Sequence, residues 1–149
     1  MVTLVRTNSK DSDFKQLVEL LDQDLAYRDG EAHTFYDQFN KIDDLKYVVV
    51  ACLGNKPIGC GAMKEFQPDS LELKRMYVLP TYRARGVAKK ILFELEDWAR
   101  ELNYGKCVLE TGKKQPEAIN LYRSNNYKII PNYGQYLGID NSVCFEKYL

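Results

Sequence analysis

Three strand-like runs follow one another between residues 46 and 79, and the pattern of a long amphipathic helix comes directly after them. The runs are rich in apolar and β-branched residues and are separated by the turn signals Gly54–Pro57 and Gln67–Ser70, which indicates an antiparallel meander. Apolar residues in the helix recur with helical spacing, and such a stripe has to lie against the sheet. The runs are 46–53, 58–66 and 71–79, and the stripe consists of Val87, Ile91, Leu92, Leu95, Trp98, Ala99 and Leu102.

Strands and helices alternate in the rest of the chain. A meander followed by strand and helix units predicts an α/β (α+β) fold with a mixed central sheet and helices on both faces. The weakly patterned segment Arg28–Asp44, with its short helix, is expected to act as a lid. The full order is β-α-α-β-β-β-α-β-α-β-β, with further strands at Val2–Arg6, Lys106–Glu110, Tyr127–Ile130 and Val143–Tyr148 and further helices at Asp11–Tyr27 and Pro116–Asn125.

Composition limits the classes of protein to which the chain can belong. Its 149 residues, 45% of them hydrophobic, are enough for one core, so we expect a single domain over residues 1–149. The 21 basic residues balance the 21 acidic ones, which disfavours binding to nucleic acid or to an anionic membrane. There is no signal-like start and no membrane-spanning apolar run, so we expect a cytoplasmic protein.

The four cysteines stand singly inside apolar stretches. Cysteine is among the most buried residue types, and the chain has no Cys-x-x-Cys pair. We therefore expect buried reduced thiols, with no disulfide framework and no metal site.

A basic, glycine-containing loop joins the third strand of the meander to the long helix. The first N–H groups of a helix have no partner within the helix, and the helix dipole is positive there, so a phosphate group binds well at this position. Gly86 lets a ligand approach the backbone, Ala88 is small, and Arg83 and Arg85 add positive charge. The loop therefore predicts a pyrophosphate site, although a solvated basic turn has the same composition. It lacks the glycine patterns of dinucleotide-binding folds and of nucleoside triphosphatases.

The loop resembles the pyrophosphate loop of the GNAT superfamily of N-acetyltransferases, written Q/R-x-x-G-x-G/A. Arg83, Gly86 and Ala88 occupy its three specified positions. Downstream, the segment 118–127 is similar to the family's A-x-x-L-Y-x-x-x-G-F pattern, with Asn126 in place of the glycine. Asn tolerates the left-handed backbone that such a helix end requires. Gln115 stands where the family often has Asn.

The resemblance implies a GNAT-like fold and an acyl-CoA-dependent N-acetyltransferase that uses acetyl-CoA and no metal. Backbone groups of Met76 and Val78 are then expected to bond the cofactor arm and to polarise the thioester carbonyl. The residues expected to contact the cofactor are Met76, Tyr77, Val78, Arg83, Ala84, Arg85, Gly86, Val87, Ala88, Gln115, Asn120 and Tyr122.

Tyr122 falls at the tyrosine with which the family protonates the departing thiolate. Its usual pKa of about 10 keeps the hydroxyl protonated near neutral pH, so it has a proton to give to the thiolate, whose thiol has a pKa of about 8.5. Tyr122 also fits a helix-face aromatic residue that only packs in the core.

Two carboxylates are candidates for the general base. Glu72 aligns with the base of histone-type relatives, and strict alternation places it on the same strand face as Met76 and Val78. Four strand residues span about 13 Å, so Glu72 would act through water. Glu110 at the end of the next strand is the rival, and a third alternative is that neither acts and positioning suffices.

The acceptor is expected to be the primary amine of a small or amino-acid-like molecule, because the aromatic lid favours a closed pocket. A protein acetyltransferase acting on lysine or an N-terminus, and a non-catalytic acyl-CoA-binding module, are the alternatives. His33 in the lid is either solvated or in contact with substrate. Tyr133, Tyr136 and Tyr148 are expected to line the acceptor pocket or a dimer contact, and the resemblance makes a homodimer conceivable.

Overall fold

The computed structural model describes residues 1–30 and 44–149, which form a seven-stranded sheet with the order β1-β2-β3-β4-β5-β7-β6. Only β4 and β5 are parallel, and every other neighbouring pair is antiparallel. The strands are β1 (Val2–Thr7), β2 (Tyr47–Leu53), β3 (Lys56–Gln67), β4 (Ser70–Val78), β5 (Lys106–Gly112), β6 (Lys128–Ile130) and β7 (Ser142–Tyr148); the α-helices are α1 (Ser12–Asp29), α3 (Val87–Glu101) and α4 (Pro116–Ser124).

The predicted α/β class with a mixed sheet is confirmed, and the predicted strands and long helices are present with ends shifted by a few residues. One boundary was wrong, because Arg28 and Asp29 belong to α1 and not to a lid. The predicted second helix and His33 lie outside the described residues.

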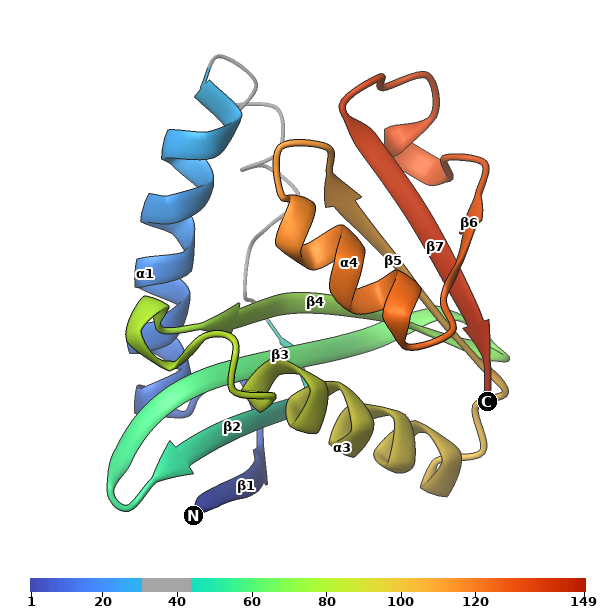
Figure 1. Ribbon diagram of the computed structural model, residues 1–149. Coiled ribbons are helices and arrows are strands. Elements are labelled where there is room, and N and C mark those ends of the chain that lie inside the picture. The colour runs from blue at the N-terminus through green and yellow to red at the C-terminus, as the bar shows by residue number, and fades with distance from the viewer. Residues whose placement is uncertain (31–43) are drawn as a thin grey trace.

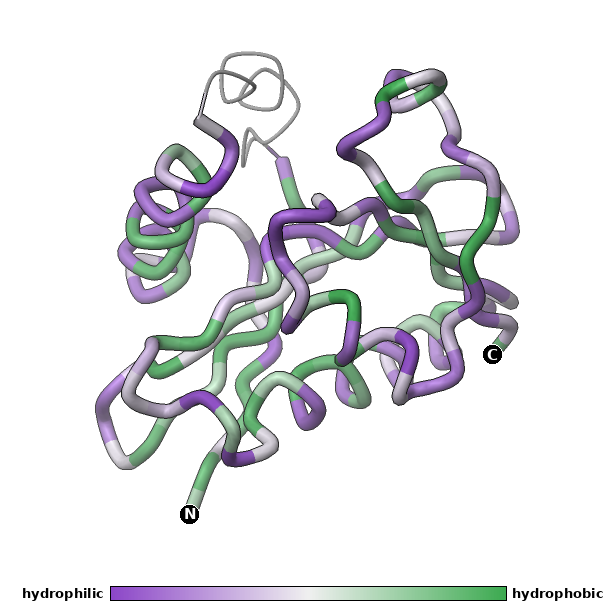
Figure 2. The backbone as a smooth tube through the Cα atoms, turned by 45° about the horizontal axis from the view of Figure 1, so that its top comes forward, coloured by the Kyte–Doolittle hydropathy of each residue, from purple (hydrophilic) through white to green (hydrophobic). Residues whose placement is uncertain are grey.

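Helices cover both faces of the sheet (Figure 1). The side chain of Asp11 begins α1 by accepting a 2.9 Å hydrogen bond from the N–H of Phe14. The buried residues of α1 pack on one face of β2, β3 and β4. The apolar stripe of α3 packs on the other face together with α4, and Figure 2 shows hydrophobic and hydrophilic residues alternating along both long helices.

The parallel pair β4 and β5 is short. Its register runs only from Ser70–Lys106 to Glu72–Val108, after which the two strands diverge, as Figure 1 shows. The loop after β4 leads into α3, and the loop after β5 leads into α4. The sheet therefore opens into a gap flanked by the first turns of two helices, the place where ligands bind in open α/β sheets.

A β-bulge in β4 reverses the direction of its side chains. Lys74 pairs with Ala62 and Tyr77 with Cys60, so the single residue Gly61 of β3 lies opposite both Arg75 and Met76. Glycine suits this position, because an added Cβ on Gly61 would crowd the side chains of Met76, Ile91 and Leu95.

The bulge corrects the prediction that Glu72 shares a strand face with Met76 and Val78. Before the bulge, Leu71 and Leu73 pack on the α3 side, which directs Glu72 toward the α1 side. After it, Met76 and Val78 pack on the α3 side. The strict alternation of side chains between the two faces fails here, because the bulge inserts one extra residue between Glu72 and Met76.

A buried polar network joins α3 to the C-terminal strand. Glu96 of α3 is 2% exposed, accepts a 2.8 Å hydrogen bond from the Tyr127 hydroxyl and lies 2.9 Å from the Lys147 ammonium of β7. Burial raises the pKa of Tyr127, which keeps this hydroxyl a donor. A buried carboxylate is stable only while its partners remain in place.

We predict that Lys147→Met lowers the free energy of unfolding by about 3 kcal/mol, because it leaves the Glu96 carboxylate buried without its cation. Urea denaturation measures the loss. The double variant Lys147→Met/Glu96→Gln removes the stranded charge and should recover part of it. A single variant as stable as the native chain, or a double variant less stable than the single one, would contradict this assignment.

Candidate functional site

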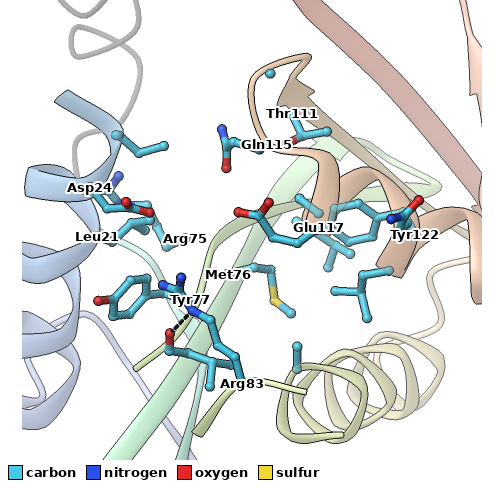
Figure 3. A pocket seen from close by; sticks show the side chains of 18 of the residues that line it. Leu21, Asp24, Arg75, Met76, Tyr77, Arg83, Thr111, Gln115, Glu117 and Tyr122 are labelled. Atoms are coloured by element: carbon cyan, nitrogen blue, oxygen red, sulfur yellow. Dashed lines mark hydrogen bonds between the residues drawn. The ribbon is translucent and has the colours of Figure 1, made fainter. Parts of the chain in front are cut away.

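A cleft of about 560 Å³ lies between α1, the diverging ends of β4 and β5, and the first turns of α3 and α4 (Figure 3). Every residue that the sequence assigned to catalysis or cofactor binding lines this cleft, except Arg85. The lining residues from that set are Glu72, Met76, Tyr77, Val78, Arg83, Ala84, Gly86, Val87, Ala88, Glu110, Gln115, Asn120 and Tyr122. Elements far apart in the sequence thus contribute to one site.

The N-terminus of α3 forms one end of the cleft. Gly86 is its N-cap residue, with φ 78° and ψ 10°, and the helix has no side-chain cap. A Cβ on Gly86 would meet no atom within 4 Å, so the positive φ, and not crowding within the protein, favours glycine here. Exposed N–H groups at a helix start beside open space fit a pyrophosphate.

Arg83 holds the loop against the end of β4. Its Nε donates a 2.8 Å hydrogen bond to the carbonyl oxygen of Val78, and its guanidinium lies 5.4 Å from the centre of the Tyr77 ring. Arg85 lies over the Tyr82 ring, 5.7 Å from its centre. The Nε of Arg83 and the carbonyl oxygen of Val78 are therefore already bonded to each other within the protein. The contacts of Arg83, Arg85, Tyr77 and Val78 with a cofactor stay predictions.

Helix α4 forms the opposite wall. Gln115 precedes its first turn with no side-chain cap bond, and Pro116 occupies the first turn. Asn126, just after the helix, has φ 73°, which confirms that the asparagine there adopts the left-handed conformation. The departure from the family's glycine is therefore structurally neutral.

Tyr122 of α4 is 5% exposed and packs against the rings of Tyr127 and Phe145, with centres 5.6 and 6.0 Å away. It also lines the cleft. Burial, and next the charge of Glu110, raise the pKa of Tyr122, so the hydroxyl holds its proton. Tyr122 is thus a core residue that also reaches the cleft, and its role as an acid stays a prediction.

Glu72 has both of its carboxylate oxygens engaged. The Tyr133 hydroxyl donates to one oxygen at 2.6 Å, and the Lys74 ammonium lies 3.1 Å from the other. Of the three tyrosines expected near the acceptor, Tyr133 therefore contacts a cleft residue and Tyr136 lines the cleft directly, whereas Tyr148 is 71% exposed.

Glu110 differs from Glu72 in having an oxygen to spare. Its Oε2 is buried and has no hydrogen-bond partner in the described part of the chain. Burial raises the pKa of Glu110 to about 7, with further increases from the charges of Asp29 and Glu72 against the lowering effects of Ser142 and Lys74. A carboxyl group with such a pKa can accept a proton near neutral pH.

Two features of the cleft were missed by the sequence analysis. Arg75 lines the cleft from the β4 bulge, and Arg28 of α1 forms an ion pair with Glu117 in the first turn of α4. A basic residue at an apolar position of an alternating strand signals a bulge, and this pattern was present at Arg75. The ion pair joins residues far apart in sequence and had no local signal.

Comparisons with known proteins identify the class to which this fold and cleft belong. The sequence profile of the Acetyltransferase (GNAT) family matches residues 14–127. The chain is 31% identical to the IAA acetyltransferase of Azospirillum brasilense over 99% of this chain and 98% of that protein. The crystal structure of an acyl-CoA N-acyltransferase from Klebsiella pneumoniae aligns with a TM-score of 0.84, 27% identity and coverage of 100% and 98% of the two chains. The chain therefore belongs to the GNAT acetyltransferase family.

Family membership makes the protein an acyl-CoA-dependent acyltransferase that uses acetyl-CoA for N-acetylation. The fold also matches the PaiA N-acetyltransferase of Thermoplasma acidophilum in complex with coenzyme A, with a TM-score of 0.75, 17% identity and coverage of 100% and 99%.

Residues 1–30 and 44–149 contain neither a group of metal-ligating side chains nor a membrane-spanning helix. No three His, Cys, Asp or Glu side chains there gather as metal ligands, and no helix there is long and apolar enough to cross a membrane. All four cysteines are free thiols, and three of them are buried.

We predict that Gly86→Asp weakens acetyl-CoA binding at least about tenfold relative to Gly86→Asn. Asp and Asn have the same shape and both tolerate a positive φ, so the pair isolates the effect of a negative charge beside the expected pyrophosphate. Calorimetric titration at low and high salt measures both variants, and the difference should shrink at high salt. Equal affinities at low salt would show that no anionic group binds at this helix start.

Proposed function

We propose that this protein, as a single domain of residues 1–149, acetylates the primary amine of a small or amino-acid-like acceptor by direct attack of the amine on acetyl-CoA. The observation that carries the proposal is the pairing, in one cleft, of an uncapped helix N-terminus with a carboxyl group whose pKa is raised to about 7. The first suits the anionic end of the donor, and the second suits removal of a proton from the acceptor.

The donor would lie across the sheet opening. Its pyrophosphate would bind at the loop that includes Gly86, and its arm would follow β4 past Val78 to Met76. Backbone groups beyond the last β4–β5 pair face a gap instead of a neighbouring strand, so they suit an extended arm that hydrogen-bonds like a strand. The Met76 N–H is the proposed donor to the thioester oxygen.

Glu110 is the proposed general base. An amine acceptor is a protonated ammonium ion near neutral pH, and it has to lose a proton before its nitrogen can attack. Within the described residues, Glu110 has a buried oxygen without a hydrogen-bond partner that can take that proton, whereas both oxygens of Glu72 are engaged. Glu72 is better assigned to holding Lys74 and Tyr133 at the wall of the cleft.

The reaction then balances in four steps. The acceptor ammonium gives one proton to Glu110, and its nitrogen attacks the thioester carbon to form a C–N bond. The tetrahedral oxyanion collapses and the C–S bond breaks. Tyr122 protonates the departing thiolate of CoA, and the second proton lost by the nitrogen returns through water to Tyr122.

The ion pair between Arg28 and Glu117 favours a small acceptor. It joins the end of α1 to the start of α4, and Glu117 lines the cleft. Such an ion pair between the two walls narrows the cleft between the end of α1 and the start of α4, whereas a protein substrate needs an open groove. A non-catalytic acyl-CoA-binding role would leave the raised pKa of Glu110 without a purpose.

The proposal is tested by release of free CoA from acetyl-CoA over a panel of small primary amines, with a lysine-containing peptide as the protein-type acceptor. Turnover with the peptide alone would contradict a small acceptor. Binding of acetyl-CoA without turnover of any amine would support the non-catalytic role instead.

We predict that kcat/KM of the native chain falls as the pH drops through about 7, because the base has to be deprotonated to accept a proton. Glu110→Gln should lower the rate about 10²- to 10⁴-fold and abolish this inflection. Glu72→Gln serves as the matched control and should keep an inflection, moved to lower pH because the charge of Glu72 contributes to the raised pKa of Glu110. A Glu110→Gln variant that retains both the rate and the inflection would exclude Glu110 as the base.

A further inference from the structure

We infer that the acceptor carries a carboxylate beside its amine, and that the guanidinium of Arg75 binds this carboxylate. The inference rests on the proposed function, since it concerns the acceptor of that reaction. It follows from the bonding of Arg75, from its place on the bulge and from its relation to Glu110.

Arg75 is a buried cation with donors to spare. Its side chain is 3% exposed, and its Nη2 lies 2.8 Å from a carboxylate oxygen of Asp22. Its Nε and Nη1 are buried and have no partner in the described residues. Unpartnered buried donors of a charged group are costly for a fold, so their presence indicates a group that is satisfied by a ligand.

The ion pair with Asp22 neutralises the positive charge of Arg75 only in part. The Asp22 side chain is 41% exposed and contacts the guanidinium at one nitrogen only. Guanidinium groups bind carboxylates best through two parallel N–H bonds. Each of the unpartnered atoms Nε and Nη1 forms such a fork together with Nη2, and Nη2 carries two N–H groups, of which the single bond to Asp22 uses one.

The backbone holds Arg75 in a strained position at the cleft. Its φ is 59°, a left-handed conformation that is unfavourable for a residue other than glycine. Because Gly61 lies opposite both Arg75 and Met76, the bulge directs Arg75 toward α1 while Met76 packs on the α3 side. Figure 3 labels Arg75 among the side chains that line the cleft.

Arg75 and Glu110 stand on the two diverging walls of the gap. Arg75 is three residues beyond the last β4–β5 pair, and Glu110 is two residues beyond it, so both lie about 7 to 10 Å past that pair. Leu109 packs on the α3 side, which directs Glu110 toward the same α1 side as Arg75. A molecule with neighbouring ammonium and carboxylate groups can engage both residues at once.

Neighbouring charges leave this role to Arg75. Lys74 is paired with Glu72, and Asp24 is paired with Arg28. Arg83 bonds the carbonyl of Val78, and Lys89 belongs to the first turn of α3, so both stand at the expected cofactor end of the cleft. Asp29 makes a contact of its own and adds negative charge near Glu110, which suits the ammonium end of the acceptor.

The test compares acceptors that differ only in the carboxylate. A panel of L-amino acids is screened for release of CoA, and the best of them is compared with its amide and its decarboxylated amine. We expect kcat/KM of the native chain to be at least about tenfold lower for both analogues, in line with a charge-assisted hydrogen bond. The amide's amine is less basic than that of the amino acid and the decarboxylated amine's is more basic, so basicity cannot explain a loss in both.

Arg75→Met should lower kcat/KM for the amino acid to the level of its analogues and remove the preference among the three. Arg75→Lys keeps the charge without the two-pronged geometry and should fall in between. Acetyl-CoA affinity by calorimetry should stay within about twofold in both. Arg100→Met, at an exposed arginine of α3, is the control and should change none of these values.

The outcomes separate this inference from the proposed function. The role of Arg75 is wrong if kcat/KM of the native chain is equal for amino acids and for carboxylate-free amines, or if Arg75→Met keeps the preference for amino acids. The proposed reaction stands in either case. If no primary amine releases CoA, the proposed function fails and this inference fails with it. Should Arg75→Met not fold, the three acceptors on the native chain still decide the matter.

Discussion

The early separation of β4 from β5 is the constraint on which the rest of the structure depends. Strands β4 and β5 are paired over only three residues each and then diverge. Beyond that point β4 stays hydrogen-bonded to β3 on its other side. Backbone groups that a continuous sheet would use are left facing a cleft. The bulge opposite Gly61 occurs just beyond this point and sends Arg75 and Met76 to opposite faces. One irregularity thus separates Met76, on the side where the cofactor arm is expected, from Arg75, on the side where the acceptor is proposed to bind.

The two hydrophobic cores keep this opening in place. Residues of α1 pack on one face of the sheet, and α3 and α4 pack on the other, so the walls of the cleft rest on well-packed helices. The buried contacts of Glu96 with Tyr127 and Lys147 fix α3 to the C-terminal strand. Because the uncapped start of α3 is part of the cleft, this anchoring also positions the expected phosphate site.

The parts of the fold that depend on local pattern were predictable from the sequence. Helical spacing predicted the buried stripe of α3, and the loop glycine Gly86 proved to be the left-handed N-cap residue. These features are set by neighbours in the chain. The same is true of Asn126, whose positive φ the sequence anticipated.

The features that the sequence did not predict depend on tertiary pairing. The bulge needs Gly61 of β3 opposite β4, and without it alternation places Glu72 on the wrong face. The preference for Glu110 over Glu72 arises from Tyr133 and Lys74, which occupy Glu72 and leave an oxygen of Glu110 free. Neither the pairing of Gly61 with the bulge nor the contacts of Glu72 with Tyr133 and Lys74 can be recognised in the local pattern of the sequence.

The most direct test of the central claim is a crystal structure of the protein with acetyl-CoA. The account predicts that the cofactor arm enters the gap between β4 and β5, with the thioester oxygen near the Met76 N–H and the pyrophosphate at the first turn of α3. A cofactor bound outside this gap, or strands β4 and β5 that remain paired beyond Glu72 and Val108 around it, would contradict the account.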